Sequence, residues 1–167
     1  MIQCIVGSEV DIRMYSIDDI SNFYLSKKSM SPKKLQKILY YAYSWTLAIF
    51  NDCVEELDFK LFNEPIEAWV HGPVVPCIYQ KYKSYGWGDI PKSTMCNNYT
   101  IPNEIVEILD QVWDVYGEFS GNQLEAFTHS ETPWIIARIG CSLTSPSHNV
   151  ISDIEIFKYY NKRLQDE

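Results

Sequence analysis

The sequence has no long hydrophobic run and no stretch that resembles a linker. None of its apolar segments approaches the roughly 18 residues that a membrane-spanning helix needs. The opening segment, MIQCIVGSEVDIR, carries acidic residues where a signal peptide has basic ones, and it has no long apolar core. We therefore expect a chain that neither spans a membrane nor is secreted, and we expect it to act in the cytoplasm.

The sequence also lacks the cysteine and histidine patterns of metal sites and of disulfide-rich proteins. Its 5 cysteines form no C-x-x-C pair, and none has the short spacing to a histidine that zinc sites use. The chain contains neither a phosphate-binding glycine loop nor the H-E-x-x-H and G-x-S-x-G motifs of hydrolases. These absences predict reduced thiols, no cofactor, no metal and no catalytic role.

Basic residues are fewer than acidic residues. The chain has 14 Lys and Arg against 22 Asp and Glu, which gives a formal net charge of -8. Because proteins bind nucleic-acid backbones mainly through cations, this balance argues against nucleic acid as a partner. The exception is a group of lysines with no acid among them, which is either a solvated helix start or a docking patch: Lys27, Lys28, Lys33, Lys34 and Lys37.

What the chain does have is enough apolar material for one folded domain. Hydrophobic residues make up 46% of its 167 residues. We expect a single domain over residues 14–167, preceded by a lead, residues 1–13, without clear periodicity. The 12 tyrosines and 5 tryptophans exceed what a core of this size must absorb, so we also expect aromatic side chains on a protein-binding surface.

The strongest helical signal is the segment from Pro32 to Phe50. Its apolar residues recur with the 3.6-residue period of a helix and occupy more than one face, as in a helix that others cover. Ser31 is positioned as the N-cap, and proline suits the first turn. We therefore place this helix at the centre of the fold.

Further helices and short strands are predicted around it. Caps, first-turn prolines and apolar spacing predict helices over residues 16–28, 76–86, 102–116, 120–127, 132–140 and from 152 onward. Residues 66–71 read as extended, with candidate strands at 98–101, which could pair with them, and at 150–151. The predicted fold class is mainly α, a single compact helical domain around a central helix at about residues 32–50, with at most a small two- or three-stranded sheet.

Two of these helices carry more detailed predictions. On the helix over 76–86, a buried stripe is expected from Ile78, Tyr79, Tyr82 and Tyr85. On the last helix, Ser152 and Glu155 have the spacing of a capping box, and three apolar residues should face inward: Ile154, Phe157 and Leu164.

Two motifs have both a structural and an interface interpretation. Trp69, Gly72 and Pro73 read as a tight bend into a helix, with a buried indole and a glycine that permits close approach, or as part of an interface. The polar residues Thr128, His129, Ser130 and Glu131 suit the N-terminus of the helix that follows, and Arg138 could pair with Glu131. The same tetrad equally suits a binding surface, and the sequence leaves both readings open.

One cysteine and two histidines define the only enzyme hypothesis. His71 and His129 have no third ligand at short spacing, so we interpret them as structural histidines. Cys77 with His71 or His129 would give a hydrolase-like nucleophile and base, with Glu131 or Glu67 to orient the base. The flanking Pro76 and Ile78 indicate a buried thiol, which makes this the alternative rather than the main hypothesis.

Three separated segments, taken in order, resemble one protein family. LQKILYYAYSW (35–45), IEAWVHGPVVPCIYQKY (66–82) and LEAFTHSETPWIIAR (124–138) are similar to the Panacea antitoxin domain, which also occurs in SocA-like antitoxins and as a phage-associated domain. The resemblance extends from about Ser16 to about Arg163. It implies a mainly helical domain that binds and neutralises a toxin, commonly encoded beside it, without catalysis.

In SocA-like members, the resemblance instead implies a proteolytic adaptor that delivers the toxin to a cellular protease. The expected partners are therefore a cognate toxin from a neighbouring gene and, for an adaptor, a protease. The residues that we select as partner-binding or motif positions are Lys33, Lys34, Lys37, Trp69, His71, Gly72, Pro73, Tyr79, Thr128, His129, Glu131, Trp134 and Arg138.

Overall fold

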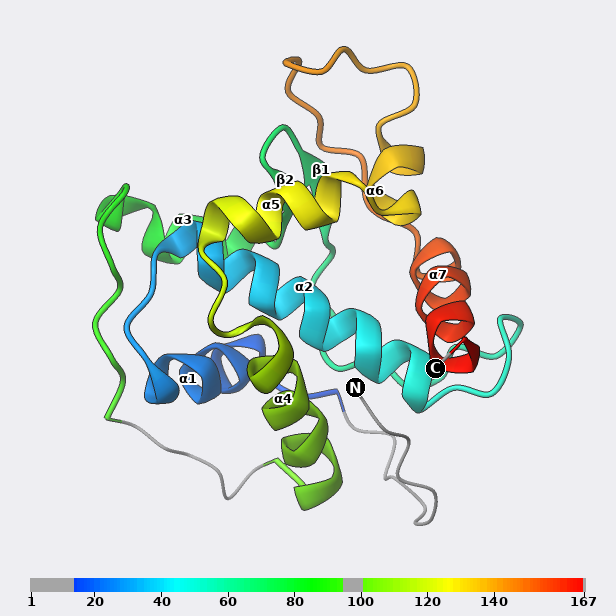
Figure 1. Cartoon of the computed structure of the whole chain (residues 1–167), viewed down its shortest axis with the longest axis horizontal. Helices are drawn as coiled ribbons and strands as arrows, with labels where there is room; N and C mark the ends of the chain where they lie inside the picture. The colour runs from blue at the N-terminus through cyan, green and yellow to red at the C-terminus, as the bar shows by residue number, and fades with distance from the viewer. Residues whose placement is uncertain (1–13, 95–100, 167) are drawn as a thin grey trace.

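A computed structural model describes residues 14–94 and 101–166, and one helix runs through its centre (Figure 1). This helix, α2 (Pro32–Ile49), starts where the sequence predicts, because the Ser31 hydroxyl accepts a hydrogen bond from the Lys34 amide at 3.3 Å. Every residue from 34 to 48 is buried. The prediction of a central helix that other elements cover is therefore confirmed.

The other elements pack around α2. Its contacts are most extensive with α7 (Asp153–Gln165), α4 (Asn103–Tyr116) and α5 (Gly121–His129). The remaining helices are α1 (Ile17–Lys27), α3 (Pro76–Tyr82), the 3-10 turn η1 (Lys83–Tyr85) and α6 (Thr132–Ala137). In Figure 1, α1 and α4 lie below α2, and the hairpin and α3 lie on the opposite side.

The sheet is a single hairpin within the described residues. Strand β1 (Glu67–Trp69) pairs antiparallel with β2 (Gly72–Val74), so the mainly α fold class with a small sheet is confirmed. We predicted an extended segment over residues 66–71, but we took Gly72 and Pro73 for part of a tight bend into the next helix and not for a second strand. The proposed partner strand at 98–101 falls largely on residues 98–100, which lie outside the described part of the chain.

The candidate strand at residues 150–151 exists only as a bridge to the outer edge of β1. Glu67 pairs with Val150 in an isolated antiparallel bridge. The amide of Ala68 donates to Asn149 O and that of Ile151 donates to Ile66 O, both at 2.8 Å. These bonds join the hairpin to the segment that leads into α7.

The core is rich in aromatic side chains. The rings of Tyr41 and Tyr116 stack with centroids 3.8 Å apart, and Trp45 Nε1 donates to the Tyr116 hydroxyl at 3.2 Å. Tyr160 from α7 meets the Trp45 ring edge-on at 4.9 Å. Our expectation that surplus aromatic residues would line the surface is therefore wrong for most tyrosines, because the core absorbs them.

Three expectations about individual side chains are also wrong. Tyr79 is 37% exposed on α3 itself, and Tyr85 is 41% exposed because the last residues of the predicted 76–86 helix tighten into η1. Ile154 is 45% exposed because α7 buries Ile156, Phe157 and Tyr160 instead. Ser152 is the N-cap residue of α7, but its hydroxyl makes no capping bond.

Among the described residues, no helix is both long enough and apolar enough to cross a membrane.

Candidate functional site

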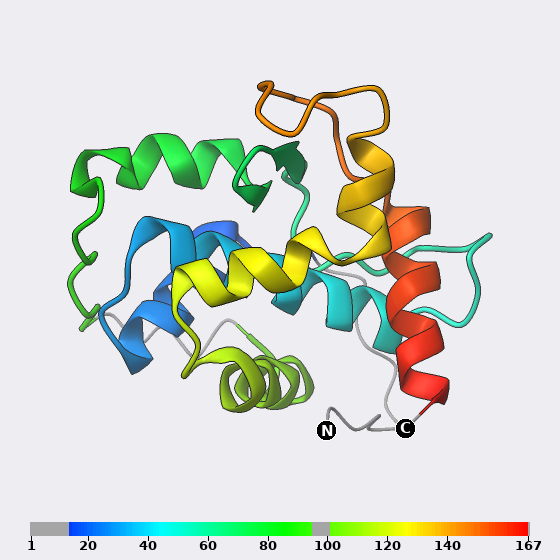
Figure 2. The same cartoon turned by 45° about the horizontal axis from the view of Figure 1, so that its top comes forward.

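Most of the residues selected from the sequence gather around the β1–β2 hairpin. The hairpin is packed against α2 and α5, and Figure 2 shows α3 and α6 at its two ends. The tight turn between the strands brings Trp69, His71, Gly72 and Pro73 together. We call this region the hairpin site, and we describe its parts from the inside outward.

At the base of the hairpin site, a buried lysine passes directly beneath a glycine. Gly72 has φ +93°, and a Cβ at this position would lie 2.7 Å from Lys37 Cε and 2.8 Å from Thr128 Oγ1. Lys37 Nζ donates to the Pro73 carbonyl at 2.9 Å. Burial of Lys37 lowers its pKa to about 7. Only glycine therefore fits here, as the sequence prediction of close approach required.

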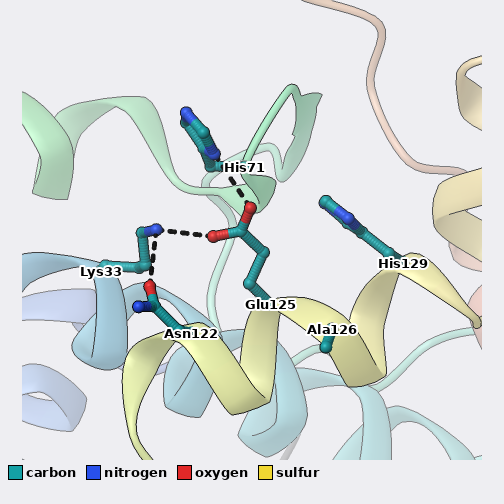
Figure 3. A pocket seen from close by; sticks show the side chains of 6 residues that line it. All are labelled: Lys33, His71, Asn122, Glu125, Ala126 and His129. Atoms are coloured by element: carbon teal, nitrogen blue, oxygen red, sulfur yellow. Dashed lines mark hydrogen bonds and ion pairs between the residues drawn. The ribbon is translucent and has the colours of Figure 1, made fainter. Parts of the chain in front are cut away.

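Beside the turn lies a shallow cleft of about 280 Å³, which His71, Lys33, Asn122, Glu125, Ala126 and His129 line (Figure 3). Glu125 Oε2 accepts from Lys33 Nζ at 2.6 Å, and Oε1 lies 2.9 Å from His71 Nδ1. Lys33 Nζ also donates to Asn122 Oδ1 at 3.0 Å. Partial burial would raise the pKa of Glu125, but the interactions with Lys33 and His71 outweigh it and hold that pKa below its ordinary value.

His129 closes the far side of the cleft. Its imidazole stacks on the Trp134 indole, with centroids 4.1 Å apart and planes inclined by 21°. His129 Nε2 is buried and has no hydrogen-bond partner among the described residues. Burial lowers the pKa of this histidine, so the neutral imidazole is favoured.

Two side chains from the α6 region fasten the hairpin to the rest of the protein. Trp134 Nε1 donates to the Trp69 carbonyl at 3.0 Å, and Arg138 Nη1 donates to the Ala68 carbonyl at 3.0 Å. Arg138 Nη2 donates to the Ser142 and Ser145 carbonyls. Arg138 therefore holds the hairpin and the following loop, and the predicted Arg138–Glu131 pair does not form.

Glu131 lies in a different environment from the hairpin site. Its carboxylate accepts hydrogen bonds from three tyrosine hydroxyls, at 3.2, 3.1 and 2.7 Å, and Arg163 Nη1 lies 4.0 Å away. Burial raises the pKa of Glu131, although the tyrosines and the arginine oppose that shift. The tyrosines are Tyr40, Tyr41 and Tyr160, so Glu131 links α2 to α7.

The predicted capping role of the tetrad at residues 128–131 is also wrong. Glu131 is the N-cap of α6 but makes no side-chain capping bond. The hydroxyls of Thr128 and Ser130 donate backward, to the carbonyls of Glu125 and Phe127 in α5. These two members of the tetrad therefore close the end of α5 rather than the start of α6.

Trp69 and Tyr79 lie together on the outer side of the hairpin. Their rings meet edge-on with centroids 4.8 Å apart, and His148 contacts the Trp69 ring at 5.7 Å. Trp69 Nε1 donates to Glu67 at 2.7 Å. The Trp69 indole is only half-buried, so the expected complete burial is wrong.

The lysine group is neither a solvated helix start nor one continuous patch. Lys37 is buried under the hairpin, and Lys34 is buried with its ammonium bonded to the Gly117 carbonyl and 5.4 Å from the centroid of the Trp113 ring. Lys27 pairs with Asp110 on α4. Of the five, only Lys28 is exposed, while Lys33 lines the cleft.

The proposed nucleophile Cys77 is exposed on α3, contrary to the expected burial. Partial desolvation and the nearby Glu64 carboxylate raise the pKa of the thiol, which disfavours the nucleophilic thiolate. No hydrogen bond joins it to either histidine in the described residues. Over the same residues, no group of three His, Cys, Asp or Glu side chains is arranged to hold a metal ion.

Three residues of this region were not selected from the sequence. Glu125 and Asn122 belong to α5, whose solvent-facing polar residues look alike in sequence, although Glu125 stands within the LEAFTH segment. Trp87 is 88% exposed, and Lys33 Nζ lies 5.6 Å from its ring centroid. Composition gave no sign that this particular tryptophan would be the exposed one.

A comparison with protein families matches this chain to a known family. A family model described as "Antitoxin SocA-like, Panacea domain" matches residues 35–135. The matched segment contains most of α2, the hairpin, α3, α4, α5 and, apart from Lys33, the residues that line the cleft. No match was found among curated proteins or among solved structures.

Proposed function

The chain belongs to the antitoxin SocA-like, Panacea domain family, and from this membership we propose that it neutralises a toxin protein by forming a stoichiometric complex with it. The family match over residues 35–135 is the observation that carries the proposal. The toxin is the product of a neighbouring gene, and the complex forms in the cytoplasm. Protection comes from occlusion of the toxin, without chemistry on the part of this protein.

The state of Cys77 supports a role without catalysis. A thiol whose pKa is raised is a poor nucleophile at neutral pH. Cys77→Ser should therefore leave protection of the cell unchanged. Loss of protection by a normally folded Cys77→Ser protein would restore the hydrolase hypothesis.

The proposal is tested by expressing the neighbouring gene with and without this protein. Growth arrest by the neighbour alone, its relief by co-expression, and a 1:1 complex on size-exclusion chromatography are the expected results. A neighbour that is harmless, or one that stays toxic despite co-expression of soluble protein, would contradict the proposal.

The same experiment in a protease-deficient host separates occlusion from proteolytic delivery. Occlusion predicts that toxin levels stay constant and that rescue does not depend on the protease. Rescue that occurs only when the protease is present, together with disappearance of the toxin, would replace occlusion with the adaptor mechanism.

A further inference from the structure

Trp87 presents a large apolar surface to solvent from a well-fastened loop. Its side chain is 88% exposed. The backbone on either side is held, because Gly88 N donates to Tyr85 O at 2.8 Å and Ile90 N donates to Met30 O at 2.9 Å. An exposed indole on a fixed backbone loses little conformational freedom when a partner covers it, and tryptophan is enriched among the residues that dominate binding energies.

Lys33 makes Trp87 continuous with the cleft of the hairpin site. Its Nζ lies 5.6 Å from the Trp87 ring centroid and also bonds to Glu125 and Asn122. We call the combined area the Trp87 surface: Trp87, Lys33, His71, Asn122, Glu125 and His129. It joins an apolar platform to a polar depression, with residues from α2, the hairpin turn, the loop after η1 and α5.

The polar part of this surface offers more unused donors than acceptors. Glu125, its only carboxylate, already accepts from Lys33 and His71. Lys33 retains a third N–H, and the Asn122 amide nitrogen makes no hydrogen bond within the described residues. The His71 side chain, beside these groups, is 67% exposed. A ligand that supplies acceptors would satisfy these groups.

We propose that the Trp87 surface is the contact site for the toxin, and that the toxin places an Asp or Glu side chain at the donors of the cleft and an apolar side chain on Trp87. The inference rests on the proposed function. A carboxylate fits because Lys33 neutralises Glu125 and the remaining donors carry no matching acceptor. The phosphate backbone of a nucleic acid fits less well, since Glu125 lies in the middle of the site and the chain has a net charge of -8.

The test measures binding of purified toxin, made harmless by an inactivating substitution, to the full-length protein by calorimetry. Trp87→Ala should weaken the complex by about tenfold or more, because hot-spot truncations cost upwards of 1–2 kcal/mol. Lys33→Glu should weaken it further. Leu143→Ala, at a side chain that is 87% exposed on a different loop, is the matched control and should leave the affinity unchanged.

The charge of the partner is tested by a charge exchange. One Asp→Lys or Glu→Lys substitution in the toxin should restore binding to the Lys33→Glu protein. The assignment of an Asp or Glu side chain of the toxin to the cleft would be overturned by either of two results: tighter binding of the toxin by the Lys33→Glu protein, or the failure of every Asp→Lys and Glu→Lys substitution in the toxin to restore binding. Trp87→Ala removes only an exposed side chain, so the site remains testable even when Lys33→Glu does not fold.

The outcomes separate this inference from the proposed function. If the wild-type protein does not bind the toxin, the proposed function fails. If it binds, and the Trp87→Ala and Leu143→Ala proteins have the same affinity for the toxin, the proposed function stands and the assignment of the Trp87 surface as the contact site is wrong. If a 30-base-pair DNA duplex or a single-stranded RNA binds instead, in a manner that Trp87→Ala abolishes, the surface serves nucleic acid and the inference is overturned.

Discussion

Lys37 lies entirely inside the protein, where an ammonium group is costly to keep charged. Burial lowers its pKa to about 7, while Glu125 favours the charged form and Lys33 opposes it. His129, from α5, is the other titratable side chain that interacts with it electrostatically. Because the same lysine in the unfolded chain keeps a pKa near 10.5, folding releases a proton between these values.

This difference predicts that the protein becomes more stable as the pH rises above about 7. Between pH 7.5 and 8.5 the unfolded state binds this proton and the folded state does not, so Lys37 should increase the free energy of unfolding by about 1 kcal/mol over that pH unit. Urea denaturation at three pH values measures the slope. Lys37→Met, which keeps the length of the side chain but cannot titrate, should flatten it, and equal slopes in both proteins would contradict the assignment.

Gly72 predicts a second effect at the scale of one residue. A methyl group there would collide with Lys37 and Thr128 in a backbone conformation that disfavours any side chain, so Gly72→Ala should cost roughly 2–4 kcal/mol. Gly86→Ala is the matched control, because Gly86 has φ +56° but open space around it. It should lose only about 1 kcal/mol. Thermal melts compare the stabilities of the two variants. Equal losses of stability would show that the close contact of Gly72 with Lys37 and Thr128 is unimportant.

At the scale of elements, two tryptophans distinguish the centre of the fold from its hairpin. Trp45 of α2 is 2% exposed and contacts both Tyr116 and Tyr160, so Trp45→Ala should cost about 3–5 kcal/mol. Trp69→Ala should cost less, about 1–2 kcal/mol, since its half-buried ring loses the edge contacts with Tyr79 and His148 and the hydrogen bond to Glu67. Chemical denaturation provides both values, and a larger loss at Trp69 would reverse this ranking.

The helices could be predicted from sequence because their signals are local. Ser31 and Pro32 mark the start of α2, and Ser120 with Gln123 forms the capping box that its spacing predicts at the start of α5. These interactions join residues within one turn. A single sequence therefore contains all the information that they need.

The hairpin and the cleft could be predicted only in part, because they depend on contacts between distant segments. Trp69, His71 and Gly72 stood out through their motif, but β2 was missed since its three residues have no alternating pattern. The partner of His71 is Glu125, 54 residues later, and nothing local marks that acid. Likewise, Glu131 is held by tyrosines from α2 and α7, so the nearby Arg138 was the wrong choice.

At the scale of the molecule, the family match and the folded unit do not have the same limits. The match ends at residue 135, whereas α7 begins at Asp153. Yet α7 packs extensively on α2 and buries Phe157 and Tyr160 in the same core. The segment that carries the antitoxin match therefore depends on a helix outside it, and we predict one cooperative domain over residues 14–166.

A truncated chain that ends at residue 135 should accordingly fail to fold. Without α7, Tyr40 and Trp45 would lose the ring of Tyr160, and Glu131 would lose its shortest hydrogen bond and the nearby Arg163. An uncompensated carboxylate beside exposed core aromatics costs several kcal/mol, comparable with the whole stability of a domain. Near-UV circular dichroism and calorimetry should show a single transition for the full chain and none for the truncated one. A chain that ends at Gln165 controls for the change of terminus and should melt like the full chain, whereas a cooperative melt of the shorter fragment, or two separate transitions in the full chain, would refute the single domain.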